Sequence, residues 1–428
     1  MAQISPIVKQ ATPVVVEKAE GNWIEGTDGI RYLDFTSGIG VTSTGHCHPR
    51  VVAAAQAQVA TVIHAQATTV MHKPLLALTE KLGQVLPEGI DSVFYANSGA
   101  EAVEASLRLA RMATGRPNIV AFQGGFHGRT VAAASITTAS TKFRTGFSPL
   151  MGGVVVAPFP YAYRYGMSED EAVAFALREL DYLFATTTAP SDTAAFIIEP
   201  VQGDGGYLPA PAAFLQGLEE RARRHGILLI ADEIQAGVGR TGLFWSHQHA
   251  GIRPDIIVTA KGIASGFPIS AIAASSALMS KALPGSQGGT YGGNAVSAAA
   301  GVETLAVIAD EDLVENARRR GEQLHVGLLA LQDRFPTIGD VRGIGLMQAI
   351  EFTGEDGEPH PTAAAAVQQA AIAEKLLLLT CGPFGNVIRV VPALTVSADE
   401  IELGLEALGR ALARILTPAD ETVVAPVA

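Results

Sequence analysis

Short apolar runs alternate with amphipathic segments through the middle of the chain. The runs are rich in Ile, Leu, Val and Ala, which is typical of strands that are buried on both faces of a parallel sheet. They lie at 92–95, 118–122, 194–199, 226–232 and 254–261. Because such strands alternate with helical patterns, we expect a wound α/β sheet in this region.

A different pattern stands on either side of this region. Two strand-like segments, 21–25 and 31–35, flank Asp28-Gly29, a dipeptide that is typical of hairpin turns. After about residue 303 the chain changes to longer amphipathic segments, which we expect to form a smaller α+β domain. The pattern predicts helices at 311–335 and 361–378 and strands at 346–351 and 387–391.

These patterns divide the chain into three parts. They are an N-terminal segment, 1–49, a large domain, 50–303, and a small C-terminal domain, 304–428. The last residues, 417–428, carry two prolines and little helical pattern, so we expect a loose tail there.

Composition and charge narrow the function. The formal net charge of −12 disfavours a nucleic-acid partner and attraction to an anionic membrane. Two cysteines in 428 residues provide no disulfide framework, which fits a reducing compartment. The N-terminus lacks the apolar core of a signal peptide, and no uncharged apolar stretch reaches the roughly 18 residues that span a bilayer. We therefore expect a cytoplasmic protein with no membrane anchor.

The strands at 226–232 and 254–261 end in complementary charges, Asp232 and Lys261. Functional residues of parallel sheets lie outside the carboxyl ends of the strands, so both side chains are expected at one edge. An amine there is poorly solvated as an ammonium, so its pKa should fall and the neutral amine could attack a carbonyl. A nearby carboxylate can keep a pyridine nitrogen protonated, so the pair suggests pyridoxal phosphate. A structural ion pair is the alternative.

A phosphate site is the next requirement, and the segment 97–101, Asn-Ser-Gly-Ala-Glu, meets it. It follows a strand and begins a helix, so free backbone N–H groups and the positive end of the helix dipole would face the sheet edge. The same residues also form a capping box, with Ser98 and Glu101 three positions apart, which occurs in many helices that bind nothing.

Two further strand ends carry candidate binding groups. Phe126 follows a glycine-rich turn and could stack on a flat ring, and Arg129 offers a fork for a carboxylate. Glu199 ends the strand 194–199 and could reach a bound cofactor, although such a glutamate is usually solvated.

Other motifs are weaker. The segment 237–242 matches G-x-G-x-x-G, which would suggest a nicotinamide-dependent oxidoreductase, but no helix pattern follows its glycines directly. The histidines at 46–48 and 247–249 lack the spacing of a zinc site, so we expect no metal.

Taken together, the motifs resemble those of class III pyridoxal-phosphate aminotransferases of fold type I, and most of all the bacterial 4-aminobutyrate aminotransferases among them. The resemblance runs from about residue 35 to 412. It implies a large domain with a mostly parallel seven-stranded sheet between helices, and a smaller α+β domain formed by the C-terminal part and the N-terminal segment. The matching motifs lie at 37–46, 97–104, 126–130, 199–203, 231–242, 259–262, 289–294 and 381–389.

The resemblance also implies roles for individual residues. Lys261 would form the Schiff base and move the substrate proton, and Asp232 would hold the pyridine nitrogen protonated. Thr290 would reach the cofactor from the neighbouring subunit, which implies a homodimer; pairing of dimers into tetramers stays open. The cofactor-binding set is Ser98, Gly99, Ala100, Phe126, His127, Asp232, Gln235, Lys261 and Thr290, and the substrate-binding set is Ile39, Arg129, Glu199 and Arg389.

The reaction that the resemblance implies moves the amino group of 4-aminobutyrate to 2-oxoglutarate and gives succinate semialdehyde and glutamate. Arg129 would bind the distal carboxylate in both half-reactions. Arg389 would pair with Glu199 in the first and with the α-carboxylate of 2-oxoglutarate in the second. Acetylornithine, 5-aminovalerate, β-alanine and diamines remain alternative donors, and a decarboxylase or aminomutase on the same fold is a further alternative.

Overall fold

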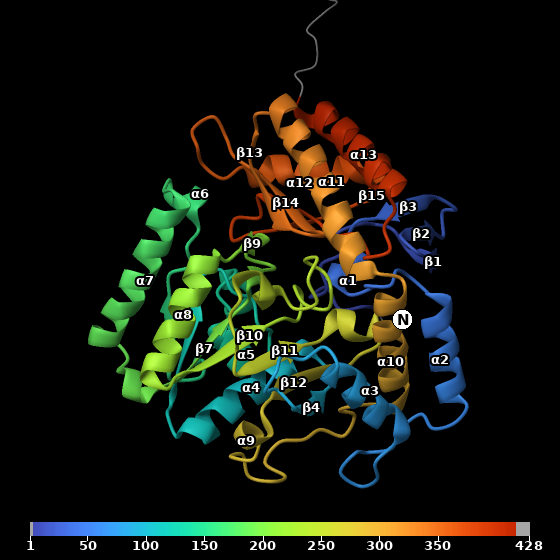
Figure 1. Cartoon of the computed structure of the whole chain (residues 1–428). Helices are drawn as coiled ribbons and strands as arrows, with labels where there is room; N and C mark the ends of the chain where they lie inside the picture. Colours follow the sequence, from blue (N-terminus) through green and yellow to red (C-terminus); the bar gives the residue numbers. More distant parts are fainter. Residues whose placement is uncertain (1–2, 417–428) are drawn as a thin grey trace, which may run out of the picture.

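The computed structural model describes residues 3–416, so the tail expected at 417–428 lies outside the described residues. A central sheet with its covering helices forms the larger part of the molecule, and the C-terminal helices and strands lie together above it in Figure 1. The N-terminal strands lie beside that C-terminal part, although the two are far apart in the sequence.

The central sheet has seven strands in the order β4-β12-β11-β10-β7-β5-β6. Only β12 runs antiparallel to its neighbours, which confirms the expected, mostly parallel seven-stranded sheet. The strands are β4 (Ser92–Ala96), β5 (Asn118–Phe122), β6 (Val154–Ala157), β7 (Thr193–Ile198), β10 (Leu228–Asp232), β11 (Ile256–Thr259) and β12 (Ser270–Ala274).

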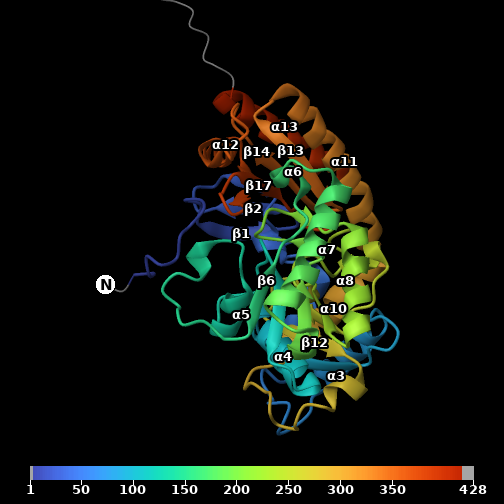
Figure 2. The same ribbon diagram turned by 90° about the vertical axis from the view of Figure 1, so that its left-hand side faces the viewer.

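Both faces of this sheet are buried, as the apolar runs predict. Along β7, Ala195 and Ile197 belong to one hydrophobic core, while Phe196 and Ile198 belong to another. Helix α4 (Gly99–Thr114) covers the first face, and α7 (Glu169–Thr186) and α8 (Ala212–His225) cover the second (Figure 2). Successive side chains of a strand point to opposite faces, so a strand such as β7 contributes to both cores.

Three further long helices pack beside the sheet. They are α2 (Pro49–Val59), α3 (Lys73–Gly83) and α10 (Ala295–Asp310), and α10 contacts both of the others. The shorter helices are α1 (Ser37–Gly40), α5 (Val131–Ile136), α6 (Ala162–Tyr165) and α9 (Ser276–Met279). Among residues 3–416, no helix is long and apolar enough to cross a membrane.

The N-terminal strands and a C-terminal strand share one sheet. The predicted hairpin is present as β2 (Trp23–Gly26) and β3 (Arg31–Asp34), preceded by β1 (Val16–Glu20). β3 pairs in parallel with β15 (Leu376–Leu377).

A second, antiparallel sheet of four strands forms the centre of the C-terminal part. Its order is β13-β14-β17-β16. Helices α11 and α12 pack against it, and α13 packs against those two helices. The elements are β13 (Ile338–Ile344), β14 (Met347–Phe352), β16 (Leu379–Cys381), β17 (Val387–Val390), α11 (Leu313–Arg334), α12 (Pro361–Ala373) and α13 (Ala398–Leu416).

The helix predicted at 361–378 is too long. α12 ends at Ala373, and Lys375 has a φ of 61°, a left-handed backbone conformation that turns the chain out of the helix. The apolar residues that follow form β15 and β16 instead. A short run of leucines fits a helix face and a buried strand equally well, and the pairing of β15 with β3 decides between them.

Candidate active site

A cavity of about 660 Å³ opens at the carboxyl ends of the central strands, below the C-terminal sheet. Of the residues predicted for the site, Ser98 and Thr290 do not line this cavity. The predicted residues that line it are Ile39, Gly99, Ala100, Phe126, His127, Arg129, Glu199, Asp232, Gln235, Lys261 and Arg389.

Asp232 and Lys261 come from neighbouring parallel strands. Asp232 is the last residue of β10 and is in register with Val258 of β11, and Lys261 begins the turn that follows β11. Lys261 lines the cavity and has a φ of 45°, a strained conformation for a residue with a side chain. Burial of the amine lowers the pKa of Lys261 to about 8, although the carboxylate of Glu199 opposes the shift.

Asp232 forms a buried pair with His127. Nδ1 of His127 lies 2.7 Å from Oδ2 of Asp232, and both side chains are almost fully buried. The other oxygen of Asp232 accepts a hydrogen bond from the backbone N–H of Ile234 at 3.1 Å. Burial alone would lower the pKa of His127, but the hydrogen bond to Asp232 and the negative charges of Asp232 and Glu199 together outweigh burial and raise that pKa. His127 and the N–H of Ile234 therefore hold the Asp232 carboxylate in a fixed orientation.

The N-terminus of α4 meets the cavity, and it is also capped. The hydroxyl of Ser98 accepts a hydrogen bond from the N–H of Glu101 at 3.3 Å, and the Glu101 carboxylate accepts one from the N–H of Ser98 at 2.9 Å. The capping box is therefore confirmed, and the phosphate site stays a prediction. The next two residues, Gly99 and Ala100, line the cavity, and N–H groups in a first helical turn have no partner within the helix.

Thr290 lies in the exposed segment between α9 and α10. Because it stands outside the lining of its own chain's cavity, its predicted contact with a cofactor requires a second subunit and stays a prediction.

Aromatic and cationic side chains form one wall of the cavity. Phe126 packs edge-on against Phe143 with 5.0 Å between the ring centroids. The guanidinium of Arg129 lies 5.0 Å from the ring centroid of Phe143 and is exposed to solvent. A partly solvated arginine at the mouth can receive a carboxylate without a large desolvation cost.

The structure does not contain the ion pair expected between Glu199 and Arg389. The two carboxylate oxygens of Glu199 accept hydrogen bonds from the backbone N–H groups of Phe126 at 2.7 Å and Gly203 at 2.9 Å. Burial raises the pKa of Glu199 to about 7.

Arg389 pairs with Asp204 instead. Its Nη1 lies 3.1 Å from Oδ1 of Asp204, and Arg389 is 6% exposed. Asp204 also lines the cavity, and its backbone C=O accepts a hydrogen bond from the N–H of Gly382 at 2.9 Å. Sequence reasoning overlooked this residue, although the signal was present: an acid between glycines, in a turn directly after Glu199.

The glycine-rich stretch 237–242 has a structural role. No helix follows it directly, since the next element is a short 3-10 turn, Ser246–Ala250. Arg240 within it is 1% exposed and donates hydrogen bonds to the backbone C=O groups of Leu346 and Pro392. The stretch thus joins the large sheet to the C-terminal part and does not build a dinucleotide site.

Comparisons with known proteins agree with this geometry. The sequence model of the family "Aminotransferase class-III" matches residues 5–412. The chain is 39% identical to a 5-aminovalerate aminotransferase of Pseudomonas putida over 95% of each chain. It is 38% identical to a 4-aminobutyrate aminotransferase of Escherichia coli over 94% of each.

A solved structure shows the same fold. An amine transaminase from an uncultivated Pseudomonas species, determined with pyridoxal phosphate bound, superposes with a TM-score of 0.91 at 30% identity. The alignment covers 97% of this chain and 99% of that one. With a lysine, a buried carboxylate and a helix N-terminus around one cavity, this chain belongs to the class III aminotransferases and is a pyridoxal-phosphate-dependent enzyme.

Proposed function

We propose that this aminotransferase moves the amino group of an ω-amino acid, with 4-aminobutyrate as the preferred donor, to 2-oxoglutarate. The products are succinate semialdehyde and glutamate. The observation that carries the proposal is the pair of arginines in one cavity, of which the exposed Arg129 is open to a carboxylate and the buried Arg389 is neutralised by Asp204 at 3.1 Å.

The two substrates present a charge problem that this pair solves. 4-Aminobutyrate has one carboxylate and 2-oxoglutarate has two, so a second arginine would be left unpaired in one half-reaction. A buried arginine without a partner is costly, and Asp204 supplies the partner while 4-aminobutyrate is bound. The α-carboxylate of 2-oxoglutarate then replaces Asp204, while Arg129 binds the distal carboxylate of either substrate.

The residues of the cavity also fit the cofactor. When bound, pyridoxal phosphate supplies an electron-withdrawing ring that stabilises negative charge at the substrate carbon. Asp232, oriented by His127, would hold a proton on the ring nitrogen. The N–H groups of Gly99 and Ala100 would bind the phosphate at the positive end of α4.

The remaining predicted residues orient the ring and the substrate. Phe126 would cover one face of the ring. Gln235, which accepts a hydrogen bond from the hydroxyl of Tyr207 at 2.8 Å, would bind the phenolic oxygen. The amine of Lys261 would hold the cofactor and would accept the proton of the substrate carbon. Ile39, 45% exposed, stands at the entrance and excludes bulky groups.

The working unit in this proposal is a homodimer. Exposed apolar side chains gather between α2 and α3, including Ile63 and Met71, which are 60% and 56% exposed. The ring of His64 lies 5.2 Å from that of Tyr291, next to Thr290. An apolar surface of this kind favours burial against a second subunit, which would bring Thr290 to the phosphate of the other chain.

A panel of donors tests the substrate assignment. With 2-oxoglutarate as acceptor, we expect kcat/KM to be highest for 4-aminobutyrate and lower for β-alanine and 5-aminovalerate by about 10- to 200-fold, because one methylene in a pocket changes binding by about 1–3 kcal/mol. 5-Aminovalerate is the second candidate, given the relative from Pseudomonas putida. Glutamate formation measures the rate, and a diamine that outperforms every ω-amino acid would contradict the proposal.

Asp204→Ala tests the charge argument. We expect kcat/KM for 4-aminobutyrate to fall by at least about 10-fold, because removing one partner of a buried charge pair is costly. Use of L-glutamate as donor should fall less, since its α-carboxylate binds Arg389. Asp204→Asn keeps the shape of the side chain and removes its charge, and it should change kcat/KM for the two donors in the same way as Asp204→Ala. If the ratio of kcat/KM for 4-aminobutyrate to that for L-glutamate is unchanged in both variants, the proposed exchange of Asp204 for an α-carboxylate at Arg389 is rejected.

A further inference from the structure

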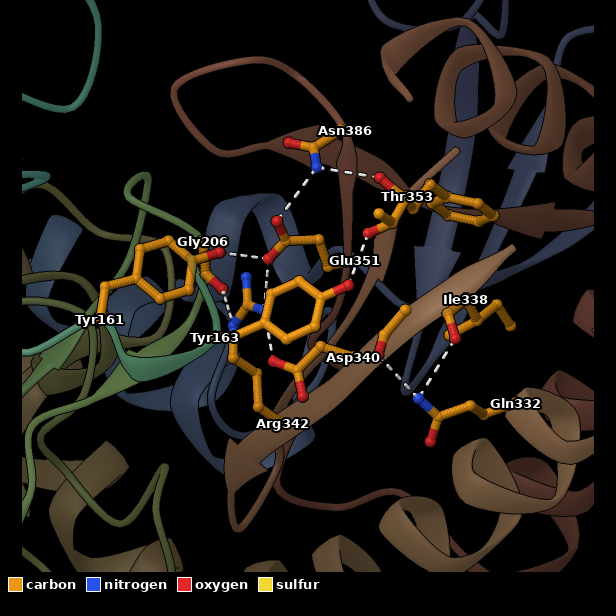
Figure 3. Close-up of polar contacts among 12 residues, drawn as sticks. Tyr161, Tyr163, Gly206, Gln332, Ile338, Asp340, Arg342, Glu351, Thr353 and Asn386 are labelled. Carbon is orange, nitrogen blue, oxygen red and sulfur yellow. Dashed lines mark hydrogen bonds and ion pairs between the residues drawn. The ribbon is translucent and has the colours of Figure 1, made fainter. Parts of the chain in front are cut away.

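A buried ionic cluster joins the C-terminal sheet to the turn that carries Asp204. Arg342 on β13 pairs with Glu351 on β14 at 2.5 Å and with Asp340 at 2.7 Å. Tyr161 donates a hydrogen bond to Glu351 from the large-domain side, and Nδ2 of Asn386 donates one at 3.1 Å (Figure 3). The proposed function assigns no role to this cluster.

Arg342 also holds the backbone of that turn. Its Nε donates a hydrogen bond to the C=O of Gly206 at 2.8 Å, as Figure 3 shows. The turn joins β8 (Val201–Gln202) to β9 (Leu208–Pro209). Gly206 has a φ of 126°, and a Cβ at this position would lie 2.9 Å from Nη2 of Arg342. Only a residue without a side chain lets Arg342 approach the backbone this closely, and this residue lies two positions after Asp204.

The sheet register places the two arginines in one row. Arg342 is paired with Ala349, and Ala349 is paired with Arg389 on the next strand. Directly paired residues of antiparallel strands point to the same face, so Arg342 and Arg389 project together, two strand spacings or about 10 Å apart at their Cα atoms. Both meet the same turn, one at the C=O of Gly206 and the other at the Asp204 carboxylate.

We propose that Arg342 is a positioning residue that holds the turn 203–206 at the place where Asp204 meets Arg389, and so sets how strongly the enzyme discriminates between donors with one and two carboxylates. The inference rests on the proposed exchange of Asp204 for an α-carboxylate. The bond from Arg342 goes to the backbone and can stay in both half-reactions, while the bond from Arg389 goes to a side chain and can be exchanged. The turn then stays in place while only the Asp204 side chain moves.

A double-mutant cycle tests this. The quantity measured is the ratio of kcat/KM for 4-aminobutyrate to that for L-glutamate. Arg342→Lys keeps the charge but loses the fork that bonds Glu351 and Gly206 together, and we expect it to lower the ratio by about 3- to 30-fold. In the Asp204→Ala background the same substitution should change the ratio by less than about 2-fold, because Arg342 acts through Asp204.

The controls separate a positioning role from a general loss of structure. Arg221→Lys is matched, because Arg221 forms an equally close two-pronged pair with Asp181 at 2.7 and 2.6 Å, between α7 and α8 and outside the cavity lining. It should leave the ratio unchanged. If Arg342→Lys fails to bind the cofactor, Tyr161→Phe replaces it, since that change removes only the hydroxyl that donates to Glu351, and it should lower the ratio to a smaller extent.

The outcomes are distinct. If Asp204→Ala lowers the ratio but Arg342→Lys leaves it unchanged, or changes it equally in both backgrounds, the positioning role is rejected and the exchange stands. If Asp204→Ala itself leaves the ratio unchanged, the exchange and the positioning role fall together. Equal losses of kcat for both donors in Arg342→Lys would likewise reject a role in discrimination.

Discussion

Lys261→Ala should abolish transamination, with kcat reduced by at least about 10³-fold, because in the proposed mechanism general base catalysis and the covalent attachment of the cofactor both depend on this amine. The visible absorbance of bound pyridoxal phosphate should change in the same variant. Lys261→Arg should be equally inactive, since a guanidinium stays protonated and cannot accept the substrate proton. Glutamate formation and a spectrum of the purified protein measure both effects.

The pH dependence of cofactor attachment checks the same residue. The pKa of Lys261 is lowered to about 8 by burial, so the amine is mostly protonated below that pH and mostly neutral above it. Only the neutral amine attacks an aldehyde, so the rate at which the apoenzyme takes up pyridoxal phosphate should rise with pH and level off above about 8. A rate that still rises steeply toward pH 10 would show an ordinary, solvated lysine.

Asp232→Asn should lower kcat by about 10²- to 10³-fold, in line with the loss of one preorganised electrostatic group. An amide cannot keep the ring nitrogen protonated, and it leaves His127 without its charged partner at 2.7 Å. The expected signature is a loss of kcat with little change in KM for 4-aminobutyrate, because Asp232 would contact the cofactor and not the substrate. Steady-state kinetics on cofactor-saturated protein measure it.

The chain contains a matched control for this substitution. Glu233 is the next residue, is fully buried, and pairs with Nδ1 of His247 at 2.8 Å, much as Asp232 pairs with His127. It stands outside the cavity lining. Glu233→Gln should therefore lower the melting temperature while the folded holoenzyme keeps most of its kcat. Equal losses of kcat in the two variants would mean that Asp232 acts through stability and not through the ring nitrogen.

The sequence predicts the parts of the site that depend on patterns within a single strand or helix. Asp232 and Lys261 end strongly apolar strands, so their common edge followed from the parallel sheet. The partner of Arg389 cannot be predicted in this way, because Asp204 and Arg389 are 185 positions apart in the sequence. No local pattern shows which of two nearby acids, Glu199 or Asp204, has its oxygens already occupied by backbone N–H groups.

The same division applies to the fold. The strand expected at 118–122 is β5, and the helix expected at 311–335 is α11 with its ends moved inward. β12 went unrecognised because Ser270–Ala274 consists mainly of small residues, and its burial comes from the neighbours β4 and β11 on either side. β15 was mistaken for helix because its partner, β3, lies at the other end of the chain.

The pairing of β3 with β15 bears on the order in which a newly made chain can assemble its active site. The N–H of Phe35 donates to the C=O of Leu377 at 3.1 Å, and the hydroxyl of Ser37 donates to the C=O of Val391 at 2.6 Å. The segment with Ile39 thus lacks its anchors until residues 377–391 have emerged from the ribosome. The sheet edge with Asp232 and Lys261 can form earlier. The residues proposed for the chemistry are therefore in place before the segment proposed to select the substrate.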